Sequence, residues 1–460
     1  MFIMYLSIQL FLLLKVFGIF VSSKQRLQYG GEEMNFYQKF EGKIMEFGTK
    51  LNNLKVLRVL RDSFMISFPL IIFGSIMLVI ANLPFLDKIL NPETLNSLKT
   101  FLGPASMTTM SITTIFVTLG IGYYFSKEEG VDPIFGAAIS LVSFLLLTPT
   151  ADGGDLGSVL QIDRLGAKGM FIGMIAAFLS AYMYTFFVKK NWTIKMPDTV
   201  PPAVSKSFAA LIPAVFTLST FLVINIIFTF TPWGNPHDFI YEIIQTPLTK
   251  LGSGIAATVV AIFAVQILWF FGLHGQIIVN SVMDPIWNTL SLENLNAFQA
   301  GAEMPNIITK QFIETFTVGL GGTGMTLIVI LAILIFMKSR QLKEIARLAA
   351  PAGLFNVNEP VTFGLPIVLN PIIAIPWIIA PVVATLVAYF AMASGLVPAT
   401  TGVAVPWTTP VLISGFLATN SIAGSILQLV QMAIVLVIWF PFLMALDKRN
   451  CDLEKEEKSA

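Results

Sequence analysis

One carboxylate stands alone in the most apolar part of this chain. Glu359 lies in the stretch FNVNEPVTFG, and residues 348–446 contain no other Lys, Arg, Asp, Glu or His. An ionised side chain is costly in a bilayer, so such a residue usually faces a cavity and serves a function. Asn356, Asn358 and Thr362 add hydrogen-bond donors and acceptors, which suit a hydroxyl-rich ligand such as a sugar. The alternative is a structural carboxylate that caps a broken helix, and the cost of burying a charge favours the functional interpretation.

Two ring side chains lie in other segments that carry glycine or proline. His274, in FFGLHGQ, is the only charged or titratable side chain between residues 251 and 283. It is either a core histidine bonded to a backbone carbonyl or part of a polar pocket, and the nearby Gln276 favours the pocket. Trp407, in VPWTTP, is either an interfacial anchor or a flat platform for a pyranose ring.

Other chemistries find little support in the residues. The chain has one cysteine, Cys451 in a short tail, which argues against a disulfide framework, a Cys-x-x-Cys redox pair and a thiolate zinc site. The two histidines, His237 and His274, are far apart, and we expect no metal and no cofactor. The run GLGGTG at 319–324 formally matches G-x-G-x-x-G, but an apolar span follows it, so we interpret it as small residues for close helix packing. A net charge of +1 argues against a nucleic-acid partner.

The composition indicates which elements must position these residues. Of the 460 residues, 55% are hydrophobic and only 12% are charged, about half the charged share of a soluble domain. Uncharged stretches of roughly 20 residues predict membrane-spanning helices. They lie at 64–85, 107–125, 133–150, 169–188, 207–230, 253–273, 315–337, 371–393 and 424–446.

A consistent count of membrane sides requires one more crossing between residues 274 and 314. Its only candidate, QIIVNSVMDPIWNTL, is short and holds Asp284 next to Pro285, so we predict a broken crossing. The segments FNVNEPVTFGLP and GVAVPWTTPVLISGFLATN are interrupted too often to be continuous helices, and we predict re-entrant hairpins there. The expected fold is an all-α polytopic membrane protein with about ten crossings and two re-entrant hairpins.

Basic residues set the expected orientation. They cluster in the loops at 189–206 and 338–347 and in the entry segment, which predicts that these face the cytoplasm together with both termini. The acidic loop at 152–163 fits the outside. The basic amphipathic stretches at 42–62 and 338–350 are either plain connectors or docking sites for a soluble partner, and we slightly favour docking.

The expected organisation follows these segments. Residues 1–33 are interpreted as an extension upstream of a second start at Met34 rather than a signal peptide. The remaining segments are a cytoplasmic amphipathic entry at 34–62, a membrane scaffold and dimerisation half at 63–235, a connecting amphipathic segment and start of the transport half at 236–337, a transport half with both hairpins at 338–447, and a cytoplasmic tail at 448–460.

Several of these stretches together resemble one known family. The stretches, in order from about residue 34 to the C-terminus, are LRDSFMISFPLIIFGS, PDTVPPAVSKSFAALIPA, FFGLHGQ, GGTGMTL, FNVNEPVTFGLPIVLNP and VPWTTPVLISGFLAT. The chain resembles the membrane subunit of bacterial sugar phosphotransferase systems, and within it enzyme IIC of the lactose, cellobiose and diacetylchitobiose family. It departs from the family pattern in its N-terminal extension and at Asn420, where a Gly is expected.

The resemblance implies a function and a set of partners. It implies a lipid-embedded homodimer in the bacterial inner membrane that moves a disaccharide by an elevator movement of its C-terminal half. The family's sugar-site His and Glu match His274 and Glu359, with Asn358 and Trp407 as matching neighbours. Glu359 would hold a sugar hydroxyl and assist as the 6-hydroxyl receives phosphate. The donor would be a phosphocysteine on a separate IIB protein, with IIA upstream, because Cys451 has no domain around it, and no residue of this chain is expected to be phosphorylated.

The residues leave other mechanisms open. A proton-coupled symporter would use Glu359 as its proton carrier and need no partner proteins. A membrane hydrolase would use Glu359 and His274 as acid and base, but the last set of spans offers no second carboxylate for glycoside cleavage. Among β-linked disaccharides we favour cellobiose, then diacetylchitobiose, then lactose, as the sugar that contacts Glu359, His274, Asn358, Trp407, Gln276 and Asn356.

Overall fold

The described part of the chain is almost entirely helical. The computed structural model describes residues 50, 53–82, 86–197, 199–365, 367 and 370–459. The expected extension at 1–33 and most of the entry segment at 34–62 lie outside these residues. The only strands among them are β1 (Thr150–Asp152) and β2 (Ser158–Leu160), which form an antiparallel hairpin. The expectation of an almost entirely helical protein is confirmed for the described residues.

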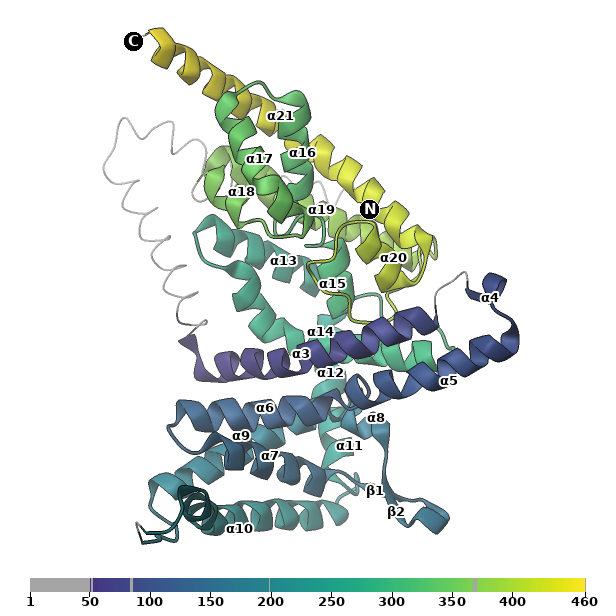
Figure 1. The fold of residues 1–460 in the computed structure, drawn as a ribbon, viewed down its shortest axis with the longest axis vertical. Helices are drawn as coiled ribbons and strands as arrows, with labels where there is room; N and C mark the ends of the chain where they lie inside the picture. The colour runs from purple at the N-terminus through teal and green to yellow at the C-terminus, as the bar shows by residue number, and fades with distance from the viewer. Residues whose placement is uncertain are drawn as a thin grey trace.

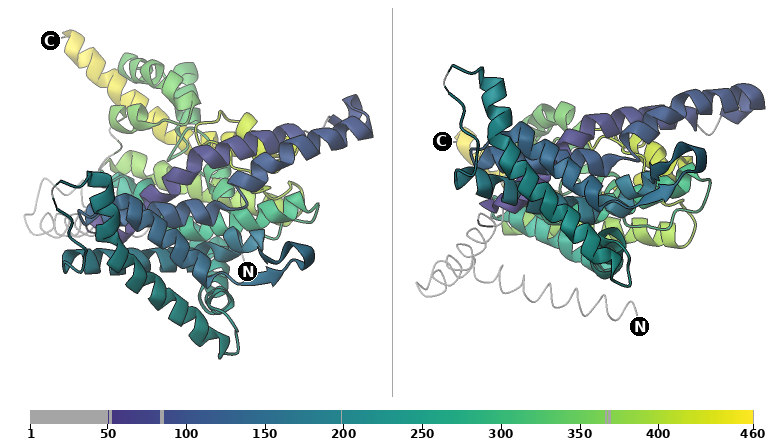
Figure 2. Two further views of the ribbon diagram at one scale, coloured as in Figure 1. Left: turned by 60° about the horizontal axis from the view of Figure 1, so that its bottom comes forward. Right: turned by 90° about the horizontal axis from the view of Figure 1, so that it is seen from below.

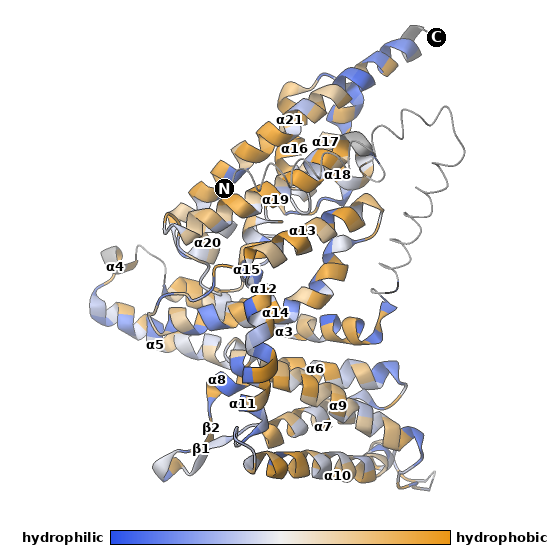
Figure 3. Ribbon diagram, turned by 180° about the vertical axis from the view of Figure 1, so that it is seen from behind, coloured by the Kyte–Doolittle hydropathy of each residue, from blue (hydrophilic) through white to orange (hydrophobic). Residues whose placement is uncertain are grey.

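A first group of apolar helices forms one end of the molecule. These helices, α3 (Lys55–Ala81), α6 (Thr113–Glu128), α7 (Pro133–Leu147), α9 (Met170–Lys189) and α10 (Pro202–Thr229), run side by side (Figure 1). Val117, Phe144 and Met170 are fully buried in their shared core. The outward face of α10 is apolar and exposed (Figure 3), as expected for a helix that faces lipid or a second subunit.

The remaining helices form the rest of the molecule. They are α4 (Leu86–Ile89), α5 (Pro92–Thr109), η1 (Gly154–Leu156), α8 (Ile162–Leu165), η2 (Ala167–Gly169), α11 (Pro236–Ile240), η3 (Tyr241–Gln245), α12 (Thr246–Gly252), α13 (Ile255–Phe270), α14 (Gly275–Gln299), α15 (Lys310–Phe316), α16 (Thr326–Phe336), α17 (Arg340–Leu354), α18 (Glu359–Gly364), α19 (Pro371–Ala393), α20 (Ile413–Thr419) and α21 (Ile422–Ser459). Trp377 of α19 and Trp439 of α21 are fully buried in a second core, which includes Val329 and Ile333 of α16.

Length and hydropathy identify the helices that can cross a membrane. Within the described residues six helical stretches qualify, at Lys55–Ala81, Pro92–Glu128, Ala167–Lys189, Pro202–Thr229, Ile373–Ala393 and Ile422–Glu456. The pair Pro236–Gly252 and Ile255–Phe270, bent by 69°, is either a broken seventh span or a re-entrant loop. The helices Pro133–Leu147 and Thr326–Phe336 are apolar but shorter. The protein is therefore a multi-span membrane protein.

Two predicted features of the second half are wrong. The crossing expected to be broken at Asp284 and Pro285 is part of one continuous helix, α14. Pro285 has no N–H to donate to the Ser281 carbonyl one turn earlier, but the helix continues through it. The break lies just before the helix, at Gly272, whose φ is 80°.

The expected single span at 315–337 is in fact two helices, α15 and α16, with residues 317–325 between them. Gly321, Gly322, Gly324 and Met325 all have positive φ in this connection. Glycine adopts these angles without strain. The glycine run thus forms a left-handed loop rather than the start of a helix, but close packing is confirmed, since Gly324 leaves no room for a side chain beside the Trp377 ring of α19.

Ion pairs join the ends of the first group of helices on one side, at the left of Figure 1. Glu129, at the end of α6, pairs with Lys55 at the start of α3 and with Lys189 at the end of α9. Arg58 pairs with Glu128 beside them (3.1 Å). Hydrogen bonds from Lys189 and Lys55 lower the pKa of the Glu129 carboxyl below its ordinary value.

The last helix projects well beyond the bundle, as the views of Figure 2 also show. On this projection, two carboxylates hold the start of α17. Asp447 accepts hydrogen bonds from the backbone N–H groups of Lys338 (2.9 Å) and Ser339 (2.7 Å). Glu454 accepts from the Ser339 hydroxyl (2.7 Å) and from the Gln341 N–H (3.0 Å). This α21–α17 clamp matters because the other end of α17 leads directly to residues 356–359.

Candidate functional site

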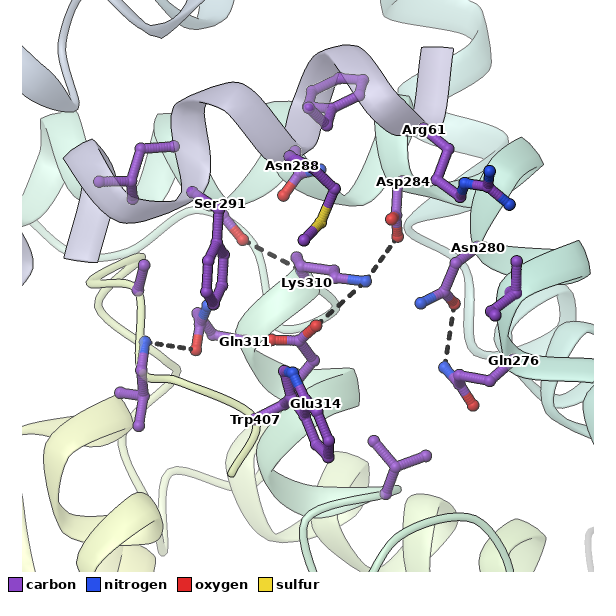
Figure 4. Close-up of a pocket in the computed structure, with 18 of the residues that line it drawn as sticks. Arg61, Gln276, Asn280, Asp284, Asn288, Ser291, Lys310, Gln311, Glu314 and Trp407 are labelled. Carbon is purple, nitrogen blue, oxygen red and sulfur yellow. Dashed lines mark hydrogen bonds and ion pairs between the residues drawn. The ribbon is translucent and has the colours of Figure 1, made fainter. Parts of the chain in front are cut away.

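A cavity of about 590 Å³ lies between α3 and the second half of the molecule. Its walls come from α3, from α14 and α15, and from the irregular segments at 317–325, 355–359 and 402–407 (Figure 4). This volume is typical of pockets that hold small molecules. All the residues that the sequence analysis singled out for sugar binding line it, namely His274, Gln276, Asn356, Asn358, Glu359 and Trp407.

His274 is the N-cap residue of α14. Its Nδ1 accepts a hydrogen bond from the backbone N–H of Ile277 (3.3 Å). A neutral ring with this bond carries its proton on Nε2, which leaves an N–H donor for the cavity. The ring packs against Trp269 (4.5 Å between ring centroids) and remains exposed. His237, by contrast, is a core histidine: it is 1% exposed, and its Nε2 lies 3.0 Å from the Thr148 hydroxyl.

Glu359 is the first residue of α18 and is half-buried. Within the described part of the chain its carboxylate makes no hydrogen bond and no ion pair. Asn358, just before it, donates from its amide to the Thr323 carbonyl (2.5 Å) and so ties the start of α18 to the glycine loop. Glu359 therefore offers an unpaired acceptor to the cavity.

Asn356 performs a different task from the one expected of it. Its side-chain carbonyl accepts from the Gly321 N–H (2.8 Å), and its amide donates to the carbonyls of Trp407 (2.6 Å) and Thr409 (3.0 Å). These bonds join three irregular segments whose backbone groups lack helical partners. With both of its amide hydrogens and its oxygen engaged, Asn356 is better suited to organising the site than to binding a ligand.

Gln276 and Trp407 differ in what they offer to a ligand. The Gln276 amide donates to Asn280 (3.0 Å), but its oxygen is buried without a hydrogen-bond partner among the described residues. The Trp407 side chain is 45% exposed, so a face of its ring is open to stacking.

The sequence analysis missed a buried ion cluster in the same cavity. The ammonium of Lys310 lies 2.6 Å from an oxygen of Asp284 and 3.2 Å from one of Glu314, and the three side chains are 11%, 23% and 16% exposed. A sequence signal existed, since Lys310 and Glu314 are four residues apart at the start of a helix. Asp284 had been interpreted as a helix breaker, and its partner lies in another helix.

Asn420, the other departure from the expected pattern, has a local explanation. It ends α20 with φ of 51°, in the left-handed region that glycine and asparagine tolerate best. Its amide also donates to the Asn82 carbonyl at the end of α3 (3.1 Å). Asparagine thus replaces the expected glycine here without backbone conflict and adds a contact between the two halves.

Comparisons with known proteins agree with this arrangement. Residues 61–381 match the family model described as "Phosphotransferase system, EIIC". The chain is 58% identical to the oligo-beta-mannoside-specific EIIC component of Bacillus subtilis (strain 168) and 40% identical to the cellobiose-specific EIIC component of Geobacillus stearothermophilus; each match covers 92% of this chain and 96% of the relative.

A solved structure gives the same result for the fold. The crystal structure of the transporter ChbC, the IIC component of an N,N'-diacetylchitobiose-specific phosphotransferase system, superposes with a TM-score of 0.85 at 41% identity. The superposition covers 90% of this chain and 99% of that one. The family suggested by the sequence stretches is thereby confirmed, and the chain belongs to the EIIC family of the phosphotransferase system, in its lactose, cellobiose and diacetylchitobiose branch.

Proposed function

We propose that this permease binds a short β-linked oligosaccharide in the cavity, carries it across the membrane and presents its 6-hydroxyl for phosphorylation. As an EIIC component, the chain is a multi-pass protein of the bacterial cytoplasmic membrane and works with IIA and IIB components and a sugar. The single observation that carries the proposal is the unpaired carboxylate of Glu359 in the cavity that also holds the free Nε2–H of His274.

The two groups have complementary roles. The Glu359 carboxylate accepts a hydrogen bond from a sugar hydroxyl, while His274 donates to a sugar oxygen. Trp407 offers an apolar face for a pyranose ring. In the transfer step the sugar O6 attacks the phosphorus of a phosphocysteine on IIB. The O–P bond forms, the S–P bond breaks, the O6 proton passes to Glu359, and IIB keeps a thiolate.

The choice of sugar is also part of the proposal. Cellobiose was the first expectation, and the 40% identical relative carries that name. The 58% identical relative is named for oligo-β-mannosides, and this greater similarity favours β-linked mannose chains over cellobiose. Diacetylchitobiose and lactose follow.

We further propose a homodimer with about ten crossings and two re-entrant hairpins, and with both termini in the cytoplasm. The second half would move as an elevator against the first, with a separate IIB protein as the phosphoryl donor. The exposed apolar face of α10 supports a lipid or subunit contact. The broken segments around the cavity support an alternating-access site.

Uptake into membrane vesicles tests the proposal. Labelled β-mannobiose and cellobiose are supplied with and without phosphoenolpyruvate and the soluble phosphotransferase proteins, including IIA and IIB. We expect the 6-phosphate to accumulate inside only with the complete set of proteins. Free disaccharide that accumulates on a proton gradient alone would identify a symporter, and released monosaccharide would identify a hydrolase.

A further inference from the structure

One face of α17 is exposed along its whole length. The sequence leaves the stretch at 338–350 open between a plain connector and a docking site for a soluble partner. The buried residues of the helix follow a three- and four-residue spacing and are Leu342, Ala346, Ala349 and Gly353. Gly353 closely approaches Ile330 of α16, whereas Leu348, on the opposite side of α17, is 80% exposed. The packing of α17 therefore uses only one of its two faces.

The exposed face changes from charged to apolar as it approaches the cavity. Arg340 and Glu344 form an ion pair at its start (2.9 Å), one turn before Leu348. After Leu348 the exposed residues of this face are apolar, and they are Pro351, Leu354 and Phe355. The chain then enters the segment that leads to Glu359. The apolar end of the face thus lies beside the segment that carries the site.

Helix α18 extends this surface. It lies next to α17 at the edge of the second half (Figure 1), and Gly364 fits closely against Ile345 of α17. Phe363, which precedes Gly364, is 66% exposed. We call Leu348, Leu354, Phe355 and Phe363 the α17–α18 patch. Exposed apolar patches with a polar rim mark sites of contact with proteins or membranes.

The charges around the patch favour a soluble protein over lipid. Arg347 is exposed next to Leu348, and Lys343 lies one turn before Arg347. Neither cation forms a hydrogen bond or an ion pair within the described ranges. Charged and apolar side chains mixed on one face are unfavourable in hydrocarbon, but an apolar centre with a polar rim is typical of a protein interface. Basic residues in this segment also predict that it faces the cytoplasm.

We propose that the α17–α18 patch is the surface on which the IIB component docks, with its phosphocysteine directed toward the sugar beside Glu359. The apolar residues form the centre of the interface. A phosphoryl group carries about −1.5 to −2 charges at neutral pH, so Lys343 and Arg347 attract the phosphorylated partner. This inference rests on the proposed function and deepens it, because a separate donor must come close to the sugar before its phosphoryl group can be transferred.

Initial rates of sugar phosphorylation test the docking surface. Solubilised full-length protein receives a saturating concentration of β-mannobiose or cellobiose, whichever the wild type binds more tightly, and increasing concentrations of phosphorylated IIB. We expect Leu348→Asp to raise the KM for phosphorylated IIB about tenfold or more, because a charge replaces an apolar contact at the centre of the interface. Sugar affinity in a binding titration, and the rate at saturating IIB, should stay within about twofold of the wild type.

A charge reversal gives a second, independent readout. Arg347→Glu should raise the KM for phosphorylated IIB severalfold and make it less dependent on salt, since charges at the rim of an interface act mainly through electrostatic attraction. This variant changes an exposed side chain, so it keeps the test valid if Leu348→Asp fails to fold.

Leu156 offers a matched control. It is 83% exposed, but it lies in the acidic loop that is predicted to face the outside, so Leu156→Asp should leave the KM for phosphorylated IIB unchanged. The photo-crosslinker p-benzoylphenylalanine in place of Leu348 should form an adduct with IIB in membrane fragments whose two sides are both accessible. The same group in place of Leu156 should form none.

The results that overturn the inference differ from one another. An unchanged KM for phosphorylated IIB in both variants would show that IIB docks elsewhere. Photo-adducts with lipid alone would identify the patch as a membrane contact, and weaker sugar binding by a folded Leu348→Asp protein would show that the patch acts on the cavity. A wild-type protein that forms no sugar 6-phosphate from phosphorylated IIB would overturn the proposed function, on which the inference rests.

Discussion

At the scale of single residues, the cavity contains an unpaired carboxylate, that of Glu359, and a fully hydrogen-bonded amide, that of Asn356. Glu359 makes no hydrogen bond within the described chain, whereas Asn356 makes three. Both occur in the same short stretch of sequence, and residue type alone suggested the same role for each. The difference arises from backbone groups of the 317–325 and 402–409 segments, which approach Asn356 only in the folded chain.

The first residue-scale prediction concerns the charge of Glu359. Glu359→Gln keeps the size of the side chain but removes a charged acceptor, so sugar affinity should fall by about tenfold or more. Isothermal titration of the purified protein with β-mannobiose measures it. Near-normal affinity would show that Glu359 is not the sugar acceptor.

The second residue-scale prediction concerns the bonds of Asn356. Asn356→Ala leaves one buried and two partly buried backbone groups without partners and should reduce the free energy of unfolding by about 2–4 kcal/mol, together with sugar affinity. Asn191 is a matched control, because it also has positive φ (56°) but is exposed at the end of α9. Asn191→Ala should lower the free energy of unfolding by about 1 kcal/mol. If thermal unfolding shows equal losses for the two variants, backbone strain alone explains the effect at Asn356.

At the scale of elements, the predicted helices agree with the structure where charged residues mark the ends of an uncharged stretch. The uncharged stretch at 371–393 coincides with α19, and the one at 169–188 is shifted by one residue from α9. The stretch at 207–230 ends one residue beyond α10. Prediction failed where a charge has a distant partner. Asp284 seemed to interrupt a helix because nothing in the sequence pairs it with Lys310, which lies on α15.

Loop conformation was the other feature of the elements that could not be predicted from the sequence. The glycines at 321, 322 and 324 have no side chains, so they give no hydrophobic periodicity and no charge pattern. The sequence therefore does not distinguish a packed helix face from a left-handed turn there. Only the approach of Asn356 and Asn358 shows why a loop forms there, since their side chains bond to this segment. The six proposed site residues could be found from sequence because they are polar or aromatic residues in apolar, interrupted segments. The ion cluster was missed because the sequence shows only the Lys310–Glu314 spacing, while Asp284 lies on another helix.

Glu129 provides an element-scale prediction on pH. Its folded pKa lies below the ordinary value of 4.5 because Lys189 and Lys55 stabilise the charged form. The contribution to stability is therefore complete above the ordinary value and is lost as the pH falls through the folded pKa. Glu129→Gln should lower stability by at most about 1 kcal/mol at neutral pH, and this difference from the wild type should shrink as thermal unfolding is measured at more acidic pH. A difference that grows in acid would contradict the assignment.

At the scale of the whole molecule, the second half of the chain links the cavity to the projecting end of α21. The α21–α17 clamp fixes the start of α17, and the chain after the end of α17 leads to Asn356, Asn358 and Glu359. Coupling between a surface and a buried site requires such a continuous rigid connection or a shared two-state element. The connection here consists of two helices and the five hydrogen bonds that Asp447 and Glu454 accept.

Removal of the clamp tests this connection. The double variant Asp447→Ala and Glu454→Ala leaves the first N–H groups of α17 without their carboxylate acceptors, so its first turn should exchange amide hydrogens faster and sugar affinity should fall severalfold. Asp452→Ala, which removes an exposed carboxylate from the same helix, is the control. Unchanged exchange in α17 would show that the clamp does not order this helix.

The length of α21 has a practical consequence. Its 38 residues extend for about 57 Å, well beyond the roughly 30 Å of a bilayer core, and its last turns carry Cys451, the only cysteine of the chain. Partial burial, with Asp447 and Glu454 nearby, raises the pKa of this thiol, so a maleimide reagent will modify it best in mildly alkaline buffer. A fluorophore or spin label attached there, with no mutation and outside the cavity, would test in real time whether the second half of the chain moves during a transport cycle.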